Sequence, residues 1–224
     1  TLRNSTIFVL AGVAVAVAFR AGVFNIGVQG QFVVGGFATV VTVLFLAPFL
    51  PTGVVGGVLL MTLGTAAAML AGGAYAAVPG VMKAYADANE VITTIMLNFI
   101  ASGVVFYLVD SHLRPEGASA PNTEQLPSYV DLPGFAFGSS SFSVIGLGVA
   151  LLTAVVVAFV LGRTRYGYDL VTSGHQAAAA AYAGVDPKRT VVLTMTFSGM
   201  VAGLAGAMFA IMILGYYSDP STFP

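Results

Sequence analysis

The chain has 224 residues, of which 58% are hydrophobic and only 8% are charged, whereas a typical soluble domain carries about a quarter charged residues. No Asp, Glu, Lys or Arg lies between Arg20 and Lys83, so this stretch cannot build a soluble surface, and we expect an all-α polytopic membrane protein. The net charge of −1 comes without a basic patch, so no nucleic acid partner is indicated, and the lack of cysteine excludes disulfides, thiolate metal sites and cysteine catalysis.

Six apolar runs follow one another along the chain. A bilayer core of roughly 30 Å needs about 20 apolar residues in a helix, and only the first run is clearly shorter. A turn with two helix-breaking prolines, Pro48 and Pro51, separates the second run from the third. We therefore expect about six transmembrane helices, at residues 5–19, 29–47, 53–78, 91–109, 142–162 and 190–214.

Basic residues beside the spans indicate the orientation of the chain. The loop of residues 163–189 carries basic residues at both of its ends, which places it in the cytoplasm. Because each span crosses the membrane once, the loop of residues 79–90 then lies on the same side, and the more acidic loop of residues 110–141 lies outside. Parity also leaves Thr1 outside, so an inward N-terminus would require one more helix before it.

Small residues recur every three or four positions in two of the expected spans. Such seams allow the close backbone approach on which helix association in lipid depends. We interpret them as packing within one chain rather than as sites of self-association. The candidate packing positions are Gly64, Ala68, Gly72 and Ala76 in the third span and Gly199, Gly203 and Gly206 in the sixth.

Amide side chains interrupt the apolar sequence at two places. Asn98 lies near the middle of a span, and burying an amide without partners costs on the order of 2–7 kcal/mol, so Asn98 must face another helix or a wet cavity. An interhelical hydrogen bond and a role in a translocation pathway are equally good interpretations. Asn25, Gln29 and Gln31 stand with three glycines between the first two spans. This stretch forms either an unwound segment at membrane depth or a short turn at the membrane surface.

The cytoplasmic loop contains a predicted short helix outside the membrane. The segment SGHQAAAAAYAGVDPKRT has five consecutive alanines, which favour a helix. Gly184 suits the position just after this helix, and Asp186 suits the N-cap of the next one, with Pro187 at its first position. The helix is either a docking element for another protein or an amphipathic connection. We expect His175 at a surface or interface, since no second metal ligand lies near it.

Motifs of catalysis are missing from the sequence. It contains no Gly-rich phosphate loop with a lysine, no paired intramembrane carboxylates and no plausible Ser/His/Asp set. We therefore expect no enzymatic activity, no cofactor and no metal site. The lack of acidic residues inside the spans also argues against a proton-coupled carrier.

Three stretches, in order and at matching spacing, resemble one protein family. FNIGVQGQF is similar to the N-I-G-x-E-G-Q motif of ABC-importer permeases for nucleosides and simple sugars, and ANEVITTIMLNFIA is similar to their V-N-E-V-I-S-T-I-M-L-N-Y-I-A. The stretch from RTRYGYDL to GLAGAM resembles their coupling loop and the helix that follows it. The resemblance covers nearly the whole chain and points to the nucleoside branch of the branched-chain amino acid, ribose and nucleoside permease superfamily. Gln29 departs from the pattern where the family has Glu, and His175 with Gln176 replaces the usual Asn-Pro.

The resemblance implies one permease domain over residues 1–224, truncated at both ends, in the plasma membrane of a prokaryote. Residues 110–141 would form an extracytoplasmic loop and residues 163–189 a cytoplasmic coupling loop. The implied partners are ABC ATPase subunits, a second permease that is identical or related, an extracytoplasmic substrate-binding protein and membrane lipid. ATP hydrolysis is expected in the separate ATPase. The translocation pathway would include Asn25, Gln29, Gln31 and Asn98, and the coupling residues would be Gly174, His175, Ala178, Ala179, Tyr182, Ala183, Gly184 and Asp186.

Uncharged amides suit neutral, hydroxyl-rich solutes, because charged cargo would need counter-charges in the spans. The resemblance to the nucleoside branch of the family makes nucleosides the expected cargo. The alternative within this class is an importer of simple sugars. The alternative from another class is a secondary carrier that needs no ATPase.

Overall fold

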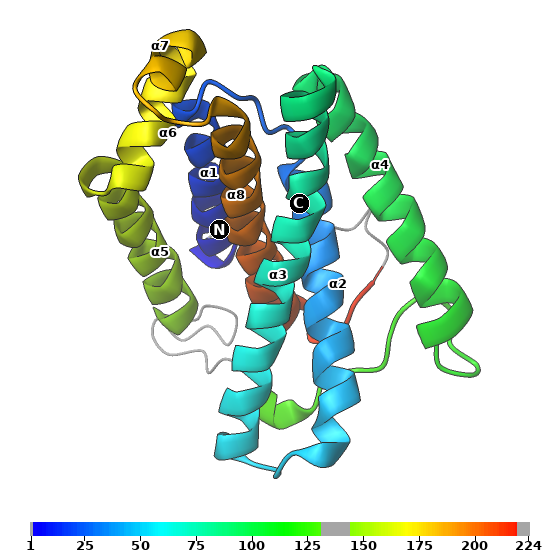
Figure 1. The fold of residues 1–224 in the computed structure, drawn as a ribbon. Coiled ribbons are helices and arrows are strands. Elements are labelled where there is room, and N and C mark those ends of the chain that lie inside the picture. Colours follow the sequence, from blue (N-terminus) through cyan, green and yellow to red (C-terminus); the bar gives the residue numbers. More distant parts are fainter. Residues whose placement is uncertain (1, 131–143, 219–224) are drawn as a thin grey trace.

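The structure, a computed structural model, describes residues 2–130 and 144–218. Within these ranges it is helical and contains no strand, which confirms the all-α fold. Each expected span appears as a helix, and α2, α3, α4, α5 and α8 are long and apolar enough to cross a membrane, while α1 is a shorter apolar helix. The helices are α1 (Leu2–Arg20), α2 (Val28–Leu46), α3 (Val54–Ala86), α4 (Glu90–Leu108), α5 (Val144–Arg163), α6 (Arg165–His175), α7 (Ala177–Tyr182) and α8 (Pro187–Phe209) (Figure 1).

Short helical turns complete the described part of the chain. The segments Ala47–Phe49 and Ser128–Val130 are single 3-10 turns. The segments Val109–Leu113 and Ala210–Leu214 extend α4 and α8 as π-helical turns. Five of the six predicted spans are thus helices long enough to cross a membrane, and the predicted span at residues 5–19 is the shorter apolar helix α1.

Helix α8 forms the centre of the bundle. It packs against α1, α2 and α3, whereas α4 lies on the outer side of α2, and α5 lies against α1 (Figure 1). Within an 18-residue stretch, 78% of the residues of α8 are buried, against 17% in α4 and in α5. The outward faces of α4 and α5 carry exposed apolar side chains such as Phe99 and Phe159, which suit contact with lipid.

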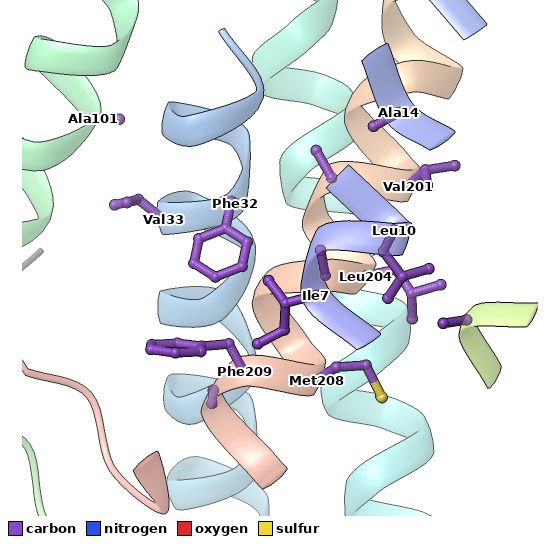
Figure 2. Packing of buried hydrophobic residues seen from close by; sticks show 14 of the residues in the cluster. Ile7, Leu10, Ala14, Phe32, Val33, Ala101, Val201, Leu204, Met208 and Phe209 are labelled. Carbon is purple, nitrogen blue, oxygen red and sulfur yellow. The ribbon is translucent and has the colours of Figure 1, made fainter. Parts of the chain in front are cut away.

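The largest apolar cluster joins α1, α2 and α8. Figure 2 shows Ile7 of α1 facing Phe32 of α2 and Phe209 of α8, and Leu10 of α1 belongs to the same cluster. The rings of Phe32 and Phe209 lie 5.4 Å apart between their centroids. Lipid is as apolar as these side chains, so their contribution to stability comes from close contact rather than from removal of water.

Small residues bring the backbones of α3 and α8 into contact. A Cβ atom placed on Gly72 would lie 2.5 Å from the carbonyl oxygen of Gly199. A Cβ atom on Gly203 would meet the backbone of Ala68 one turn further along. No side chain larger than hydrogen fits between the two helices at these positions.

The small residues of α3 and α8 also face α2. A Cβ atom on Gly206 of α8 would meet the backbone of Phe32. A Cβ atom on Gly64 of α3 would lie 3.1 Å from the side-chain methyl carbon of Thr39. The seam of small residues along α3 thus contacts two neighbours, α2 near Gly64 and α8 near Gly72.

The third span is longer than the sequence predicts, because α3 continues through Pro79. The predicted loop at residues 79–90 is therefore wrong, and the connection to α4 consists of residues 87–89. A proline inside a helix removes one backbone hydrogen bond and normally ends or kinks the helix. Pro79 and Gly80 are buried here, and a Cβ atom on Gly80 would lie 3.0 Å from Cβ of Met195. Contact with α8 on this face holds the helix on both sides of the proline.

The two predicted loops lie at opposite ends of the bundle. Helices α6 and α7 lie at the upper end in Figure 1, together with the end of α1 and the α3–α4 connection. Residues 114–130 pass along the lower end, where the backbone N–H of Leu126 donates to the carbonyl oxygen of Gly215 at 2.7 Å. The remainder of the predicted outer loop, residues 131–141, lies outside the described residues, as do the first two residues of the predicted span 142–162.

Candidate functional site

Residues 21–27, here called the connector, join α1 to α2. Gly22 adopts a φ of 68°, which residues other than glycine rarely adopt, and this allows the chain to turn directly after α1. Helices α1 and α2 each have 19 residues, about 28 Å at 1.5 Å per residue, close to the roughly 30 Å of a bilayer core. The first residues of the connector contact α6 where α1 ends, whereas Asn25 bonds Ser198 in the middle of α8 and the carbonyl oxygen of Ile26 accepts from Asn98 of α4. The connector therefore extends from the end of α1 into the bundle, to the level of the middle of α8.

A hydrogen-bonded network of buried polar side chains links the connector to three helices. The amide nitrogen of Asn25 donates to Oε1 of Gln31 at 2.9 Å and to Oγ of Ser198 at 2.8 Å. The amide nitrogen of Gln31 donates back to Oδ1 of Asn25 at 2.9 Å. Ser198 Oγ in turn donates to the carbonyl oxygen of Ala14 at 2.6 Å. None of these three side chains is more than 1% exposed, and each finds partners that offset the cost of burial.

Asn98 of α4 holds the start of α2 from the other side. Its Oδ1 accepts from the backbone N–H of Gly30 at 2.8 Å, and its amide nitrogen donates to the carbonyl oxygen of Ile26 at 3.0 Å. The first N–H groups of a helix have no partner within the helix, so Asn98 satisfies one of them from a neighbouring helix. The side chain is only partly buried. The structure thus gives Asn98 an interhelical hydrogen bond and leaves part of it accessible.

The four predicted pathway amides fall into two environments. Asn25 and Gln31 are bonded to each other in the interior, whereas Gln29 is exposed in the first turn of α2 and Asn98 lies partly exposed beside that turn. All four lie around the beginning of α2. Of the four, only Gln29 and, in part, Asn98 are exposed at the protein surface in this conformation.

Ser198 belongs to the same network but was not among the predicted site residues. Its partner Asn25 lies 173 positions away in the sequence. The signal for it was a lone serine in the apolar run TMTFSGMVAGLAG, next to a glycine that lies against α3. Polar residues inside spans usually find a partner on another helix, and a search for such residues would have included Ser198.

The predicted coupling loop is mostly helical, as two short helices. Helix α7 confirms the alanine-rich helix, and α6 before it was not predicted. Gly184 follows α7 with a φ of 83°, and its N–H donates to the carbonyl oxygen of Ala181 at 3.0 Å, while the N–H of Val185 donates to that of Ala180 at 3.0 Å. These bonds form a Schellman motif. Asp186 caps α8 as predicted, since its carboxylate accepts from the N–H groups of the two residues after Pro187.

Helix α7 presents most of its side chains outward. Ala180 is fully buried against the rest of the protein, whereas Tyr182 is 95% exposed. Asp186 lies with its carboxylate bonded at the start of α8. Gly174 differs from the others because its backbone contacts the connector. The remaining predicted coupling residues are also exposed: His175, Ala178, Ala179, Ala183 and Gly184.

Charged side chains lie beside the α3–α4 connection and at the start of α8. Lys83 of α3 pairs with Glu90 of α4 at 3.1 Å, and the ammonium group of Lys188 lies 5.4 Å from the ring centroid of Tyr85. The amide network contains no ionisable group. Among the described residues, no group of three or more His, Asp or Glu side chains is arranged to hold a metal ion. The arrangement can bind by hydrogen bonds without charge.

The chain is similar to known permeases along its whole length. It is 36% identical to the guanosine ABC transporter permease protein NupP of Bacillus subtilis, a match that covers 100% of this chain and 62% of the relative. It is 29% identical to the nucleoside ABC transporter permease protein NupB of Lactococcus lactis, covering 93% of this chain and 57% of the relative. It is 30% identical to the glucose ABC transporter permease protein TsgB13 of Haloferax volcanii, covering 88% of this chain and 52% of the relative.

The chain therefore spans less than two thirds of the length of these relatives. None of the solved structures matches it. The sequence model of the family described as the permease component of the branched-chain amino acid transport system matches residues 1–223. The resemblance seen in the three motifs is confirmed, and the chain belongs to this permease family.

Proposed function

We propose that this chain is the membrane-spanning permease part of an ATP-driven ABC importer for nucleosides, in the plasma membrane of a prokaryote. The observation that carries the proposal is the uncharged amide site at the start of α2, within a chain whose relatives are named as guanosine and nucleoside ABC permeases. A second permease, two ATPase subunits and an extracytoplasmic substrate-binding protein complete the transporter. The chain itself hydrolyses no ATP.

Helices α6 and α7 form the docking element for the ATPase. They lie beyond the ends of α5 and α8, so a second protein can reach them (Figure 1). The exposed face of α7 consists of alanines and Tyr182, and aromatic side chains are enriched in protein interfaces. The fixed caps at Gly184 and Asp186 set the angle between α7 and α8. Movement of the docked ATPase therefore acts on a stiff element joined directly to the central helix.

The amides around the start of α2 supply the binding groups for the solute. An amide side chain offers two donors and an acceptor oxygen, which match ribose hydroxyls and the edges of a base. Gln29 and Asn98 are accessible in this conformation, and Asn25 and Gln31 become accessible when α2 and α8 move apart. No formal charge lies in the network, which suits a neutral solute.

A simple sugar is the second candidate cargo, because a glucose ABC permease is among the relatives. Amide donors and acceptors serve sugar hydroxyls equally well. The two cargoes differ in the base, whose flat face adds contacts that a sugar lacks. Binding of nucleoside and not of free sugar separates the two functions.

Transport by the full-length protein tests the proposal. The permease would be reconstituted in vesicles with its ATPase and binding protein, and uptake of labelled guanosine, uridine, ribose and glucose measured with ATP or a non-hydrolysable analogue. We expect nucleoside uptake that requires both ATP hydrolysis and the ATPase. Uptake by the permease alone would show a secondary carrier, and uptake of glucose or ribose in place of nucleosides would assign the protein to the sugar importers.

A further inference from the structure

The connector lies in direct contact with the docking element. Ala21 joins Leu170 of α6 and Met195 of α8 in a small buried apolar cluster. A Cβ atom on Gly22 would lie 3.0 Å from the carbonyl oxygen of Gly174, near the end of α6. This is contact between two backbones, and neither can yield as a flexible side chain would. A displacement of α6 toward the connector must therefore displace the connector.

The other end of the connector is bonded to the core of the bundle. Asn25 bonds Gln31 at the start of α2 and Ser198 in the middle of α8. Ser198 extends the link to the backbone of α1 at Ala14. All three side chains are buried, so water does not compete for these hydrogen bonds. Within about five residues the connector thus joins α6 to α1, α2 and α8.

We propose that the connector is a second transmission path from the ATPase to the transport pathway, with Ser198 as the positioning residue that ties it to the central helix. This inference rests on the proposed function. One path runs along the chain from α7 through the Asp186 cap into α8. The second runs across the fold from Gly174 to Gly22, through Asn25 to Ser198. It moves α2, which carries Gln29 and Gln31, together with α8.

Both paths are needed because α2 has no direct link along the chain to the docking helices. A movement of α8 alone would change its contact with α2 without fixing where the start of α2 goes. The bonds of Asn25 to both helices make the start of α2 and the middle of α8 move as one unit. Removal of the Ser198 hydroxyl breaks this unit while leaving α7, its caps and its exposed face unchanged.

The first experiment compares two hydroxyl deletions in α8 in the reconstituted full-length transporter. Ser198→Ala removes the bond between helices, whereas Thr196→Val removes a hydroxyl that bonds only to the carbonyl oxygen of Val192 in the same helix. The readouts are basal ATP hydrolysis and the number of ATP molecules hydrolysed per nucleoside imported. We expect Ser198→Ala to raise the number of ATP molecules hydrolysed per imported nucleoside about fivefold or more, the lower end of usual coupling between sites. Thr196→Val should leave the ratio unchanged.

The second experiment tests the contact at the other end of the connector. Gly22→Ala and Gly215→Ala introduce the same strain, because both glycines have a φ of 68°. Only at Gly22 does the added methyl group meet another helix, since nothing lies within 4 Å of a Cβ atom on Gly215. We expect Gly22→Ala to raise the number of ATP molecules hydrolysed per imported nucleoside. Gly215→Ala should leave this number close to that of the wild type.

The outcomes separate the inference from the proposed function. If the wild-type transporter imports nucleosides with ATP but Ser198→Ala keeps the wild-type ratio, the connector path is wrong and the proposed function stands. If the wild type shows no ATP-dependent uptake, the proposed function itself has failed. If Ser198→Ala does not assemble, the comparison of Gly22→Ala with Gly215→Ala tests the inference instead. Equal effects of these two substitutions on the number of ATP molecules hydrolysed per nucleoside would overturn it.

Discussion

The substitution Gly72→Ala tests whether α3 and α8 are held together by backbone contact. The new methyl carbon would lie 2.5 Å from the carbonyl oxygen of Gly199 and 2.9 Å from Cα of Gly203, whereas ordinary contact begins at 3.4 Å. The helices would have to separate locally by about 0.9 Å, in an interior packed too densely to absorb this elsewhere. All the atoms met are backbone, so no rotamer change relieves the contact.

The expected cost follows from overpacking, which destabilises by about 1–3 kcal/mol. Replacing glycine by alanine also raises helix propensity by about 1 kcal/mol, so a control must share that gain. Gly148→Ala in α5 does so, because nothing lies within 4 Å of a Cβ atom there. We expect Gly72→Ala to be less stable than Gly148→Ala by about 1–3 kcal/mol.

The free energy of unfolding can be measured on the purified full-length protein by reversible denaturation in mixed micelles with increasing SDS. The difference between the two variants isolates the contact with α8. Equal stability of Gly72→Ala and Gly148→Ala would refute the close packing of α3 on α8.

Three further predictions concern function. Tyr182→Asp should abolish co-purification of the ATPase with a tagged permease, because a charge on the exposed face of α7 opposes an apolar interface, whereas Tyr182→Phe should retain it. Co-purification with both variants would contradict docking on α7. Asn98→Leu should lower nucleoside uptake while reducing the free energy of unfolding by no more than about 3.4 kcal/mol, because it removes two hydrogen bonds that are each worth at most about 1.7 kcal/mol between membrane helices. Uptake equal to wild type would assign Asn98 to packing alone. Uptake by reconstituted vesicles supplied with ATP should persist when an ionophore dissipates the proton gradient, since no carboxylate belongs to the amide network; its loss would indicate proton coupling.

The sequence alone determined the features that depend on neighbouring residues. The order of the spans follows from apolar runs long enough to cross a bilayer. The cap at Asp186 and the turn at Gly184 were also correct, because each rests on hydrogen bonds within a few residues of the chain. The family resemblance followed from three local motifs. It named the amides around residues 25–31 and Asn98 but could not say which of them would touch.

Only the tertiary structure decided which span is central and which polar groups meet. Spans of similar hydropathy differ in burial, because in lipid an apolar surface does not distinguish a helix that faces lipid from one that faces protein. Helix α3 continues through Pro79 because it packs against α8 there, whereas a proline considered by its local sequence predicts the end of a helix. The bond between Asn25 and Ser198 joins residues 173 positions apart. No local pattern encodes such a pairing, since it arises from the packing of α1, α2 and α8 around the connector.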